Sequence, residues 1–97
     1  MPEASRMHAV ITGRVQGVGF RYFVLRNAKQ LGLVGWVRNR ADGAVETVAE
    51  GDKQALERFI NKLKTGPSLA WVQHVSTQWQ PAEDNLVDFV IEPTAYT

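Results

Sequence analysis

The sequence predicts an α+β fold in which an antiparallel sheet carries two helices on one face. Two segments, one ending at Gly32 and one lying between Asp52 and Gly66, repeat apolar residues at helical spacing. The segments around them have the alternation or short apolar runs of strands. The predicted order is therefore β-α-β-β-α-β with a short extra strand at the end, which is typical of the ferredoxin-like, or split βαβ, fold. Right-handed crossovers place both helices on the same face of the sheet.

Residues 7–13 form the first predicted strand. Apolar residues alternate at period 2 from Met7 to Ile11, and a glycine ends the run. The other face of this segment is only weakly polar, which places the strand near the middle of the sheet. Residues 1–6 show no periodicity, so we expect them to form a disordered lead-in to a single domain over residues 7–97.

A glycine-rich loop separates this strand from the first predicted helix. Its glycines are Gly13, Gly17 and Gly19. From Phe20 onward, apolar residues recur at i, i+4, i+8 and i+11, which is the pattern of one buried face of an amphipathic helix. Gly32 stands at the position that commonly follows a helix C-terminus, so we expect the helix to end there.

A β-hairpin and a second helix are predicted next. Residues 34–38 are mostly apolar, residues 45–50 alternate, and the Ala-Asp-Gly sequence at 41–43 is typical of the turn between two strands. Asp52 is a good N-cap for the second helix. Apolar residues then recur at i, i+3, i+4 and i+7 from Leu56, and a Gly-Pro pair ends the helix.

The last part of the chain is predicted to be extended. Residues 68–79 carry spaced apolar side chains, and residues 81–85 form a turn. Phe89 and Ile91 then share one face of the short final strand. This completes the predicted sheet.

Composition excludes several kinds of site. The chain has no cysteine, so disulfides, iron–sulfur clusters, zinc knuckles and a thiol nucleophile are excluded. No apolar run is long enough to cross a bilayer, and the N-terminus lacks the apolar region of a secretory signal. We therefore expect a cytoplasmic protein with no membrane partner, and a monomer by default.

The net charge of +1 conceals an uneven distribution. Residues 1–41 carry seven basic residues and one acidic residue, a net +6, whereas residues 42–97 carry four basic and nine acidic residues, a net −5. A basic half in a nearly neutral protein is what an anion-binding site would produce. A solvated charge asymmetry with no function is the commoner explanation, so both interpretations stay open.

The segment 13–21, Gly-Arg-Val-Gln-Gly-Val-Gly-Phe-Arg, is the candidate anion site. It leads into a helix N-terminus, where free N–H groups and the helix dipole favour an anion. Glycines allow successive N–H groups to turn inward around a phosphate, and Arg21 can bind two oxygens of that phosphate. The spacing lacks the third glycine of the dinucleotide fingerprint and the Gly-Lys-Ser/Thr ending of a P-loop. On its own, the segment also fits a tight turn followed by a solvated arginine.

A second cluster covers residues 35–43, Gly-Trp-Val-Arg-Asn-Arg-Ala-Asp-Gly. It places Asn39 at the end of the second predicted strand, beside the hairpin turn. Asparagine is also a common turn residue, because it tolerates the left-handed region and caps its own backbone. We expect the neighbouring Arg40 to be solvated, and His8 to be a partly buried strand residue rather than a catalyst.

Together the two clusters resemble the signatures of the acylphosphatase family. The first match is Ile11-x-Gly13-x-Val15-Gln16-Gly17-Val18-x-Phe20-Arg21. The second match is Gly35-Trp36-Val37-Arg38-Asn39-x-x-x-Gly43-x-Val45, with Gly51 beyond it. The resemblance extends from about Met7 to Ile91, which is nearly the whole chain.

This resemblance implies a small hydrolase that cleaves the carboxyl–phosphate bond of acyl phosphates and needs no metal or cofactor. Its substrate would be a small-molecule acyl phosphate, and inorganic phosphate would be a product. In the family, the arginine of the first signature binds the phosphate and the asparagine of the second orients the attacking water. The resemblance assigns these roles to Arg21 and Asn39. It also implies that the phosphate contacts backbone amides of the loop, from Gln16, Gly17, Val18, Gly19 and Phe20.

Hydrolysis of an acyl phosphate can proceed with only an arginine, an asparagine and backbone amides. An acyl phosphate expels a carboxylate, whose conjugate acid has a pKa of roughly 4, so the leaving group needs no general acid at neutral pH. Phosphoryl transfer then depends mainly on positioning and on electrostatic stabilisation. Asn39 is a neutral amide and cannot act as a base, so we expect an oxygen of the substrate phosphate to take the proton from water.

Two alternatives remain. Acylphosphatase-like domains also begin a large hydrogenase-maturation protein that handles carbamoyl phosphate, although this chain lacks the zinc-binding cysteines that follow the domain there. RNA-recognition modules share the βαββαβ order, and the aromatic run at 20–23 is similar to their aromatic box. Here that run begins a helix, and the net charge is only +1, so we expect no nucleic-acid partner.

Overall fold

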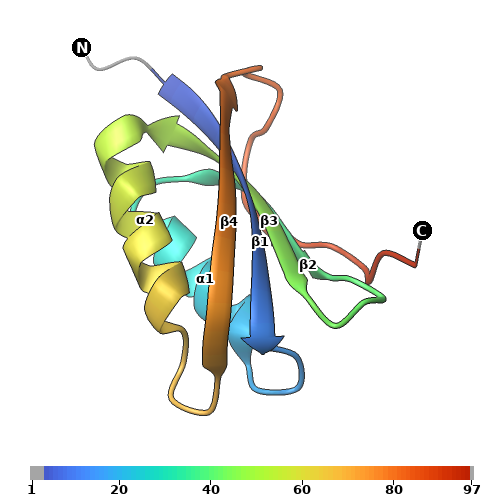
Figure 1. The fold of residues 1–97 in the computed structure, drawn as a ribbon. Coiled ribbons are helices and arrows are strands. Elements are labelled where there is room, and N and C mark those ends of the chain that lie inside the picture. Colours follow the sequence, from blue (N-terminus) through green and yellow to red (C-terminus); the bar gives the residue numbers. More distant parts are fainter. Residues whose placement is uncertain (1–3, 97) are drawn as a thin grey trace.

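The computed structural model describes residues 4–96 (Figure 1). The elements follow in the order β1 (Ala4–Arg14), α1 (Phe20–Gln30), β2 (Val34–Asn39), β3 (Val45–Asp52), α2 (Lys53–Thr65), β4 (Trp71–Pro81) and β5 (Phe89–Ile91). The predicted order is confirmed, with β5 as the short extra strand. Both helices cover the same face of the sheet (Figure 1), as the handedness of the crossovers requires.

The strands are arranged in the order β4-β1-β3-β2-β5. The first strand therefore lies inside the sheet, between β4 and β3, as its weakly polar face predicts. The expectation of a purely antiparallel sheet is wrong, because β5 pairs in parallel with β2. The chain leaves β4 at one edge and reverses direction on the way to the opposite edge, so it enters β5 alongside β2. This brings Ile91 opposite Val37, close to the end of β2.

The expected lead-in is also wrong for the residues that the structure describes, because β1 begins at Ala4 rather than at Met7. Ala4 is opposite Asp52 of β3, and Ser5 lies between Gly51 of β3 and Pro81 of β4. Pairing with β3 orders Ala4, and pairing with both β3 and β4 orders Ser5, without any apolar alternation. Residues 1–3, the rest of the expected lead-in, lie outside the described part of the chain.

The core lies between the sheet and the two helices. Its helical part consists of Phe20, Val24 and Ala28 on α1 and Leu56, Phe59 and Leu63 on α2, all of which the periodicity predicts. Leu31 and Ile60, which belong to the same two predicted patterns, are only partly buried. Met7, Ala9 and Ile11 supply the buried face of β1. The carboxylate of Asp52 accepts a hydrogen bond from the Gln54 N–H at 3.2 Å, which confirms the predicted N-cap.

The opposite face of the sheet carries a buried carboxylate, Glu50, which is only 4% exposed. It accepts hydrogen bonds from Arg6 Nη1 at 2.7 Å, from the Glu83 N–H at 3.0 Å and from the Asp84 N–H at 3.3 Å. Burial by itself would raise the pKa of Glu50. The two backbone donors and the guanidinium outweigh burial and hold that pKa below its ordinary value of 4.5.

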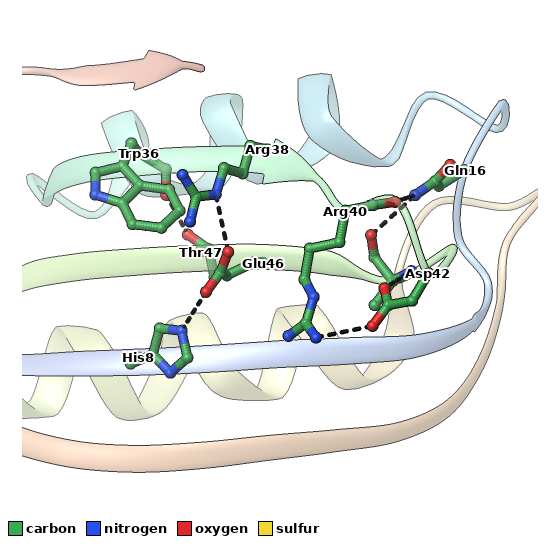
Figure 2. A network of polar contacts seen from close by, with 9 residues as sticks. His8, Gln16, Trp36, Arg38, Arg40, Asp42, Glu46 and Thr47 are labelled. Carbon is green, nitrogen blue, oxygen red and sulfur yellow. Dashed lines mark hydrogen bonds and ion pairs between the residues drawn. The ribbon is translucent and has the colours of Figure 1, made fainter. Parts of the chain in front are cut away.

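A second carboxylate on the same face, Glu46, lies between two basic side chains (Figure 2). Its Oε2 is 2.7 Å from His8 Nε2, and its Oε1 accepts a hydrogen bond from Arg38 Nε at 2.8 Å. Arg38 also stacks on the Trp36 ring, 4.5 Å from the ring centroid. Burial would raise the pKa of Glu46, but the bonds and charges of His8 and Arg38 lower it overall.

These two carboxylates predict a loss of stability in acid. Their pKa values are lower in the folded than in the unfolded chain, so their ionised forms stabilise the fold above pH 4.5 and this contribution disappears as pH falls further. Replacing Glu50 by Gln should lower the free energy of unfolding at pH 7 by about 2 kcal/mol, since charge-assisted bonds are lost. Denaturant titrations between pH 3 and pH 7 should also give a shallower pH dependence for Glu50→Gln than for the wild type. Glu57→Gln, on the exposed face of α2, is the control, and equal pH slopes for the wild type and Glu50→Gln would contradict the prediction.

Candidate active site

The loop between β1 and α1 places free backbone N–H groups at a helix N-terminus. Gly17 and Gly19 adopt left-handed conformations, with φ of 73° and 78°, which L side chains adopt only with strain. Gly19 is the N-cap of α1, and its carbonyl accepts the first helical hydrogen bond from the Phe23 N–H at 3.1 Å. The amides at the start of the helix therefore have no carbonyl partner within it. No acidic residue lies in the first turn, so the field at this end favours an anion.

A cavity of about 280 Å³ opens at this helix end. Its lining residues are Val15, Gly17, Gly19, Phe20, Arg21, Tyr22, Asn39 and Ile91. The cavity brings together both side chains singled out from the sequence, Arg21 and Asn39, although they lie on different elements. Of the predicted loop, Gly17, Gly19 and Phe20 line it, whereas Gln16 and Val18 do not.

Asn39 is the last residue of β2, where the strand reaches the cavity. It shares a face of the sheet with Val37, which is fully buried on the helix side. Its side-chain oxygen Oδ1 is buried and has no hydrogen-bond partner among the described residues. Since buried polar atoms are normally paired, a free amide oxygen at a cavity wall is suited to accept a hydrogen bond from a small molecule there.

The basic residues of the N-terminal half differ in their partners. Arg6, Arg38 and Arg40 form ion pairs with Glu50, Glu46 and Asp42. Arg40, which we expected to be solvated, donates to Asp42 at 2.8 Å and is 37% exposed. Within residues 4–96, Arg21 forms no such ion pair, so its guanidinium is available to an anion in the cavity.

Within the described residues, no histidine or carboxylate lines the cavity. His8 lies on the open face of the sheet against Glu46, as expected for a strand residue, and His74 is exposed on β4. Residues 4–96 contain no group of three or more His, Cys, Asp or Glu side chains arranged to hold a metal ion. Neither helix in this part of the chain is long and apolar enough to cross a membrane.

Sequence reasoning missed two features of the site. Ile91 reaches the cavity through the parallel pairing of β5 with β2, which periodicity does not reveal. The side chain of Gln16 donates through Nε2 to the carbonyls of Arg40 at 2.8 Å and Ala44 at 2.9 Å (Figure 2). The motif gave the position of this glutamine, but no sequence signal identified its contact with the hairpin.

Comparison with known proteins identifies the family of this chain. The family model described as Acylphosphatase matches residues 7–91. A curated relative named Acylphosphatase, from Koribacter versatilis, is 53% identical over 85 residues, covering 88% of this chain and 77% of the relative. The crystal structure of acylphosphatase from Bacillus subtilis superposes with a TM-score of 0.88 at 40% identity, covering 91% of this chain and 98% of that one.

A longer protein also contains a similar segment. Full-length HypF, in a crystal structure described as the phosphate- and nucleotide-bound form, matches with a TM-score of 0.88 at 30% identity. The match covers 98% of this chain but only 13% of HypF. Identity is higher to the shorter proteins, and both signature clusters and the cavity between them lie inside the region that the family model matches. On this evidence the chain belongs to the acylphosphatase family.

Proposed function

We propose that this protein hydrolyses the carboxyl–phosphate bond of small acyl phosphates in the cavity between α1 and the end of β2. One observation carries the proposal. The cavity combines a helix N-terminus, an arginine without an ion-pair partner in the described chain, and a buried amide oxygen without a hydrogen-bond partner there. The family supports the reaction, and the geometry supports the following roles for the residues.

Arg21 and the backbone bind the phosphoryl group. The planar guanidinium can donate to two phosphate oxygens, and the amides of Gly17, Gly19 and Phe20 supply further donors at the same wall of the cavity. The transition state of phosphoryl transfer spreads negative charge over the equatorial oxygens. Donors already held in place therefore stabilise this charge without reorganising.

Asn39 orients the attacking water. Its buried Oδ1 accepts one hydrogen of the water, and the phosphorus is then attacked in line with the leaving carboxylate oxygen. The water oxygen bonds to phosphorus as the bond from phosphorus to the carboxylate oxygen breaks. The products are a carboxylate and inorganic phosphate. The proton of the water passes to a phosphate oxygen, because the cavity-lining residues in the described part of the chain include no carboxylate or histidine that could accept it.

Replacing Asn39 by Ala should lower kcat about a hundredfold while changing KM little, because loss of alignment affects the transition state more than phosphate binding. The measurement is phosphate release from benzoyl phosphate and acetyl phosphate, in buffer containing a chelator. Asn61→Ala, on the exposed face of α2, is the matched control. Inactive wild-type protein would refute the proposed function, and full activity of folded Asn39→Ala would refute the role of this residue.

We also propose that the enzyme acts as a cytoplasmic monomer without a metal, nucleic acid or membrane partner. The residues that line the cavity all belong to this chain, so the proposed reaction needs no residue from a second copy. Phe20, Tyr22 and Phe23 begin α1 instead of lying on a strand, so they do not form the aromatic sheet surface of an RNA-recognition module.

A further inference from the structure

Gln16 lies in the phosphate-binding loop, but its side chain points away to the hairpin between β2 and β3 (Figure 2). Its neighbours in sequence, Val15 and Gly17, both line the cavity. The Nε2 group donates to Arg40 O at 2.8 Å and to Ala44 O at 2.9 Å. A primary amide nitrogen has two protons, so both of its donors are used.

The two acceptors are the residues that close the hairpin turn. The Arg40 N–H donates to Ala44 O at 2.9 Å, and the Gly43 N–H donates to Arg40 O at 3.2 Å. Arg40 directly follows Asn39 in the chain. The amide of Gln16 is thus bonded to the peptide unit next to the residue that orients the water.

These bonds join the two halves of the site. Arg21 and the loop amides come from the β1–α1 connection, whereas Asn39 comes from the end of β2. Among the described residues, the hydrogen bonds between the segments 15–19 and 39–44 are the two that Gln16 donates. They are therefore the hydrogen bonds that connect the two segments beside the cavity.

We propose that Gln16 is a positioning residue for the hydrolysis, and that its side chain holds the phosphate-binding loop at the distance from Asn39 that in-line attack requires. The inference rests on the proposed function. Alignment of a water with a phosphorus atom is sensitive to displacements of about 1 Å, which can cost roughly a hundredfold in rate. Two hydrogen bonds from one rigid amide restrict both the distance and the orientation of the loop.

Loss of the Gln16 amide should leave the fold in place. Both acceptors keep a second donor, since Ala44 O still accepts from Arg40 N–H and Arg40 O from Gly43 N–H. No buried carbonyl is therefore left without a partner, which is the costly case. The loop also keeps its left-handed glycines and its junction with α1.

The test is Gln16→Met, a side chain of similar length without donors. We expect kcat for benzoyl phosphate to fall at least tenfold. The inhibition constant of inorganic phosphate should stay within about twofold, because Arg21 and the loop amides still bind it. Gln16→Asn retains the amide but is one methylene shorter, so it should lose kcat to a similar extent. Gln78→Met, at an exposed position of β4, is the matched control.

A double variant distinguishes a positioning role of Gln16 from an unspecific loss of activity. In the Asn39→Ala background, Gln16→Met should change kcat less than about twofold, because no oriented water remains to be aligned. Unchanged kcat in Gln16→Met would overturn the inference, as would a parallel loss of phosphate affinity or a full tenfold loss in the Asn39→Ala background. Active wild type with an unaffected Gln16→Met refutes this inference alone, whereas inactive wild type refutes the proposed function.

Discussion

Arg21→Lys is expected to lose most of the hydrolytic activity although it keeps the positive charge. An ammonium group is a point charge on a flexible stem, and it cannot reproduce the two parallel N–H donors of a guanidinium. Charge-assisted hydrogen bonds contribute about 1.5–3 kcal/mol, so kcat/KM and phosphate affinity should each fall roughly tenfold to a hundredfold. Arg21→Ala should lose at least as much. Phosphate release and inhibition by inorganic phosphate measure the two effects.

The two arginines beside Asn39 are not free to replace Arg21. Arg38 and Arg40 are close in sequence to Asn39, but they are held by Glu46 and Asp42 at 2.8 Å. Arg58→Lys, on the exposed face of α2, is the matched control and should keep the wild-type rate. An Arg21→Lys variant that retained more than half of the wild-type kcat/KM would show that charge alone binds the phosphate.

Ion pairs between neighbouring strands, away from the cavity, explain much of the charge asymmetry of the sequence. The basic N-terminal segment supplies Arg6 and Arg38, and the acidic remainder supplies Glu46 and Glu50 on β3. Because β3 lies between β1 and β2 in the sheet, folding pairs these charges across neighbouring strands. For these residues, the interpretation of the asymmetry as having no function in anion binding holds. Of the basic residues in the N-terminal half, Arg21 is the one that lines the cavity, so the interpretation of the asymmetry as an anion site applies to Arg21.

Sequence patterns predicted those parts of the fold that depend on residues close together in the chain, such as the ends of the helices. The apolar spacing from Phe20 and the glycine at 32 delimit α1, and the carboxylate of Asp52 caps α2. The parallel pairing of β5 and the strand residues before Met7 depend on which backbones meet in the folded sheet. Periodicity within one segment contains no information about such partners.

The same distinction between local sequence patterns and contacts of distant segments applies to the site. The two signature clusters gave Arg21, Asn39 and the glycine loop, because their residue types and spacing are specific to a family. The contact of the Gln16 side chain with the hairpin depends on how the loop packs against a segment more than twenty positions away in sequence. Motif recognition therefore found residues that line the cavity but not the contact that connects the loop to the hairpin.

Gly35→Ala is expected to have the largest effect on stability. Gly35 lies in β2, the strand that ends at Asn39, with a φ of 149° in a region that L side chains rarely adopt. A Cβ there would overlap the backbone carbonyl oxygen of Val48 and lie 2.9 Å from the Ala49 Cα. Backbone strain and overpacking cost about 1–3 kcal/mol each, so the free energy of unfolding should fall by about 3 kcal/mol or more. For a domain of this size, this corresponds to a decrease in Tm of roughly 12–24 °C.

Gly32→Ala separates the two contributions to this loss. Gly32 also has a left-handed φ, 71°, but a Cβ added there meets no atom within 4 Å. Its substitution should therefore cost only the strain, about 1–2 kcal/mol. Denaturant titration of both variants measures their free energies of unfolding. The difference between the two losses is the cost of steric overlap where β2 lies close to β3. Equal losses for Gly32→Ala and Gly35→Ala would mean that this approach does not require glycine and that β2 can move away from β3 at little cost. In that case the position of Asn39 would be set by the hairpin and by Gln16 rather than by the packing of its own strand.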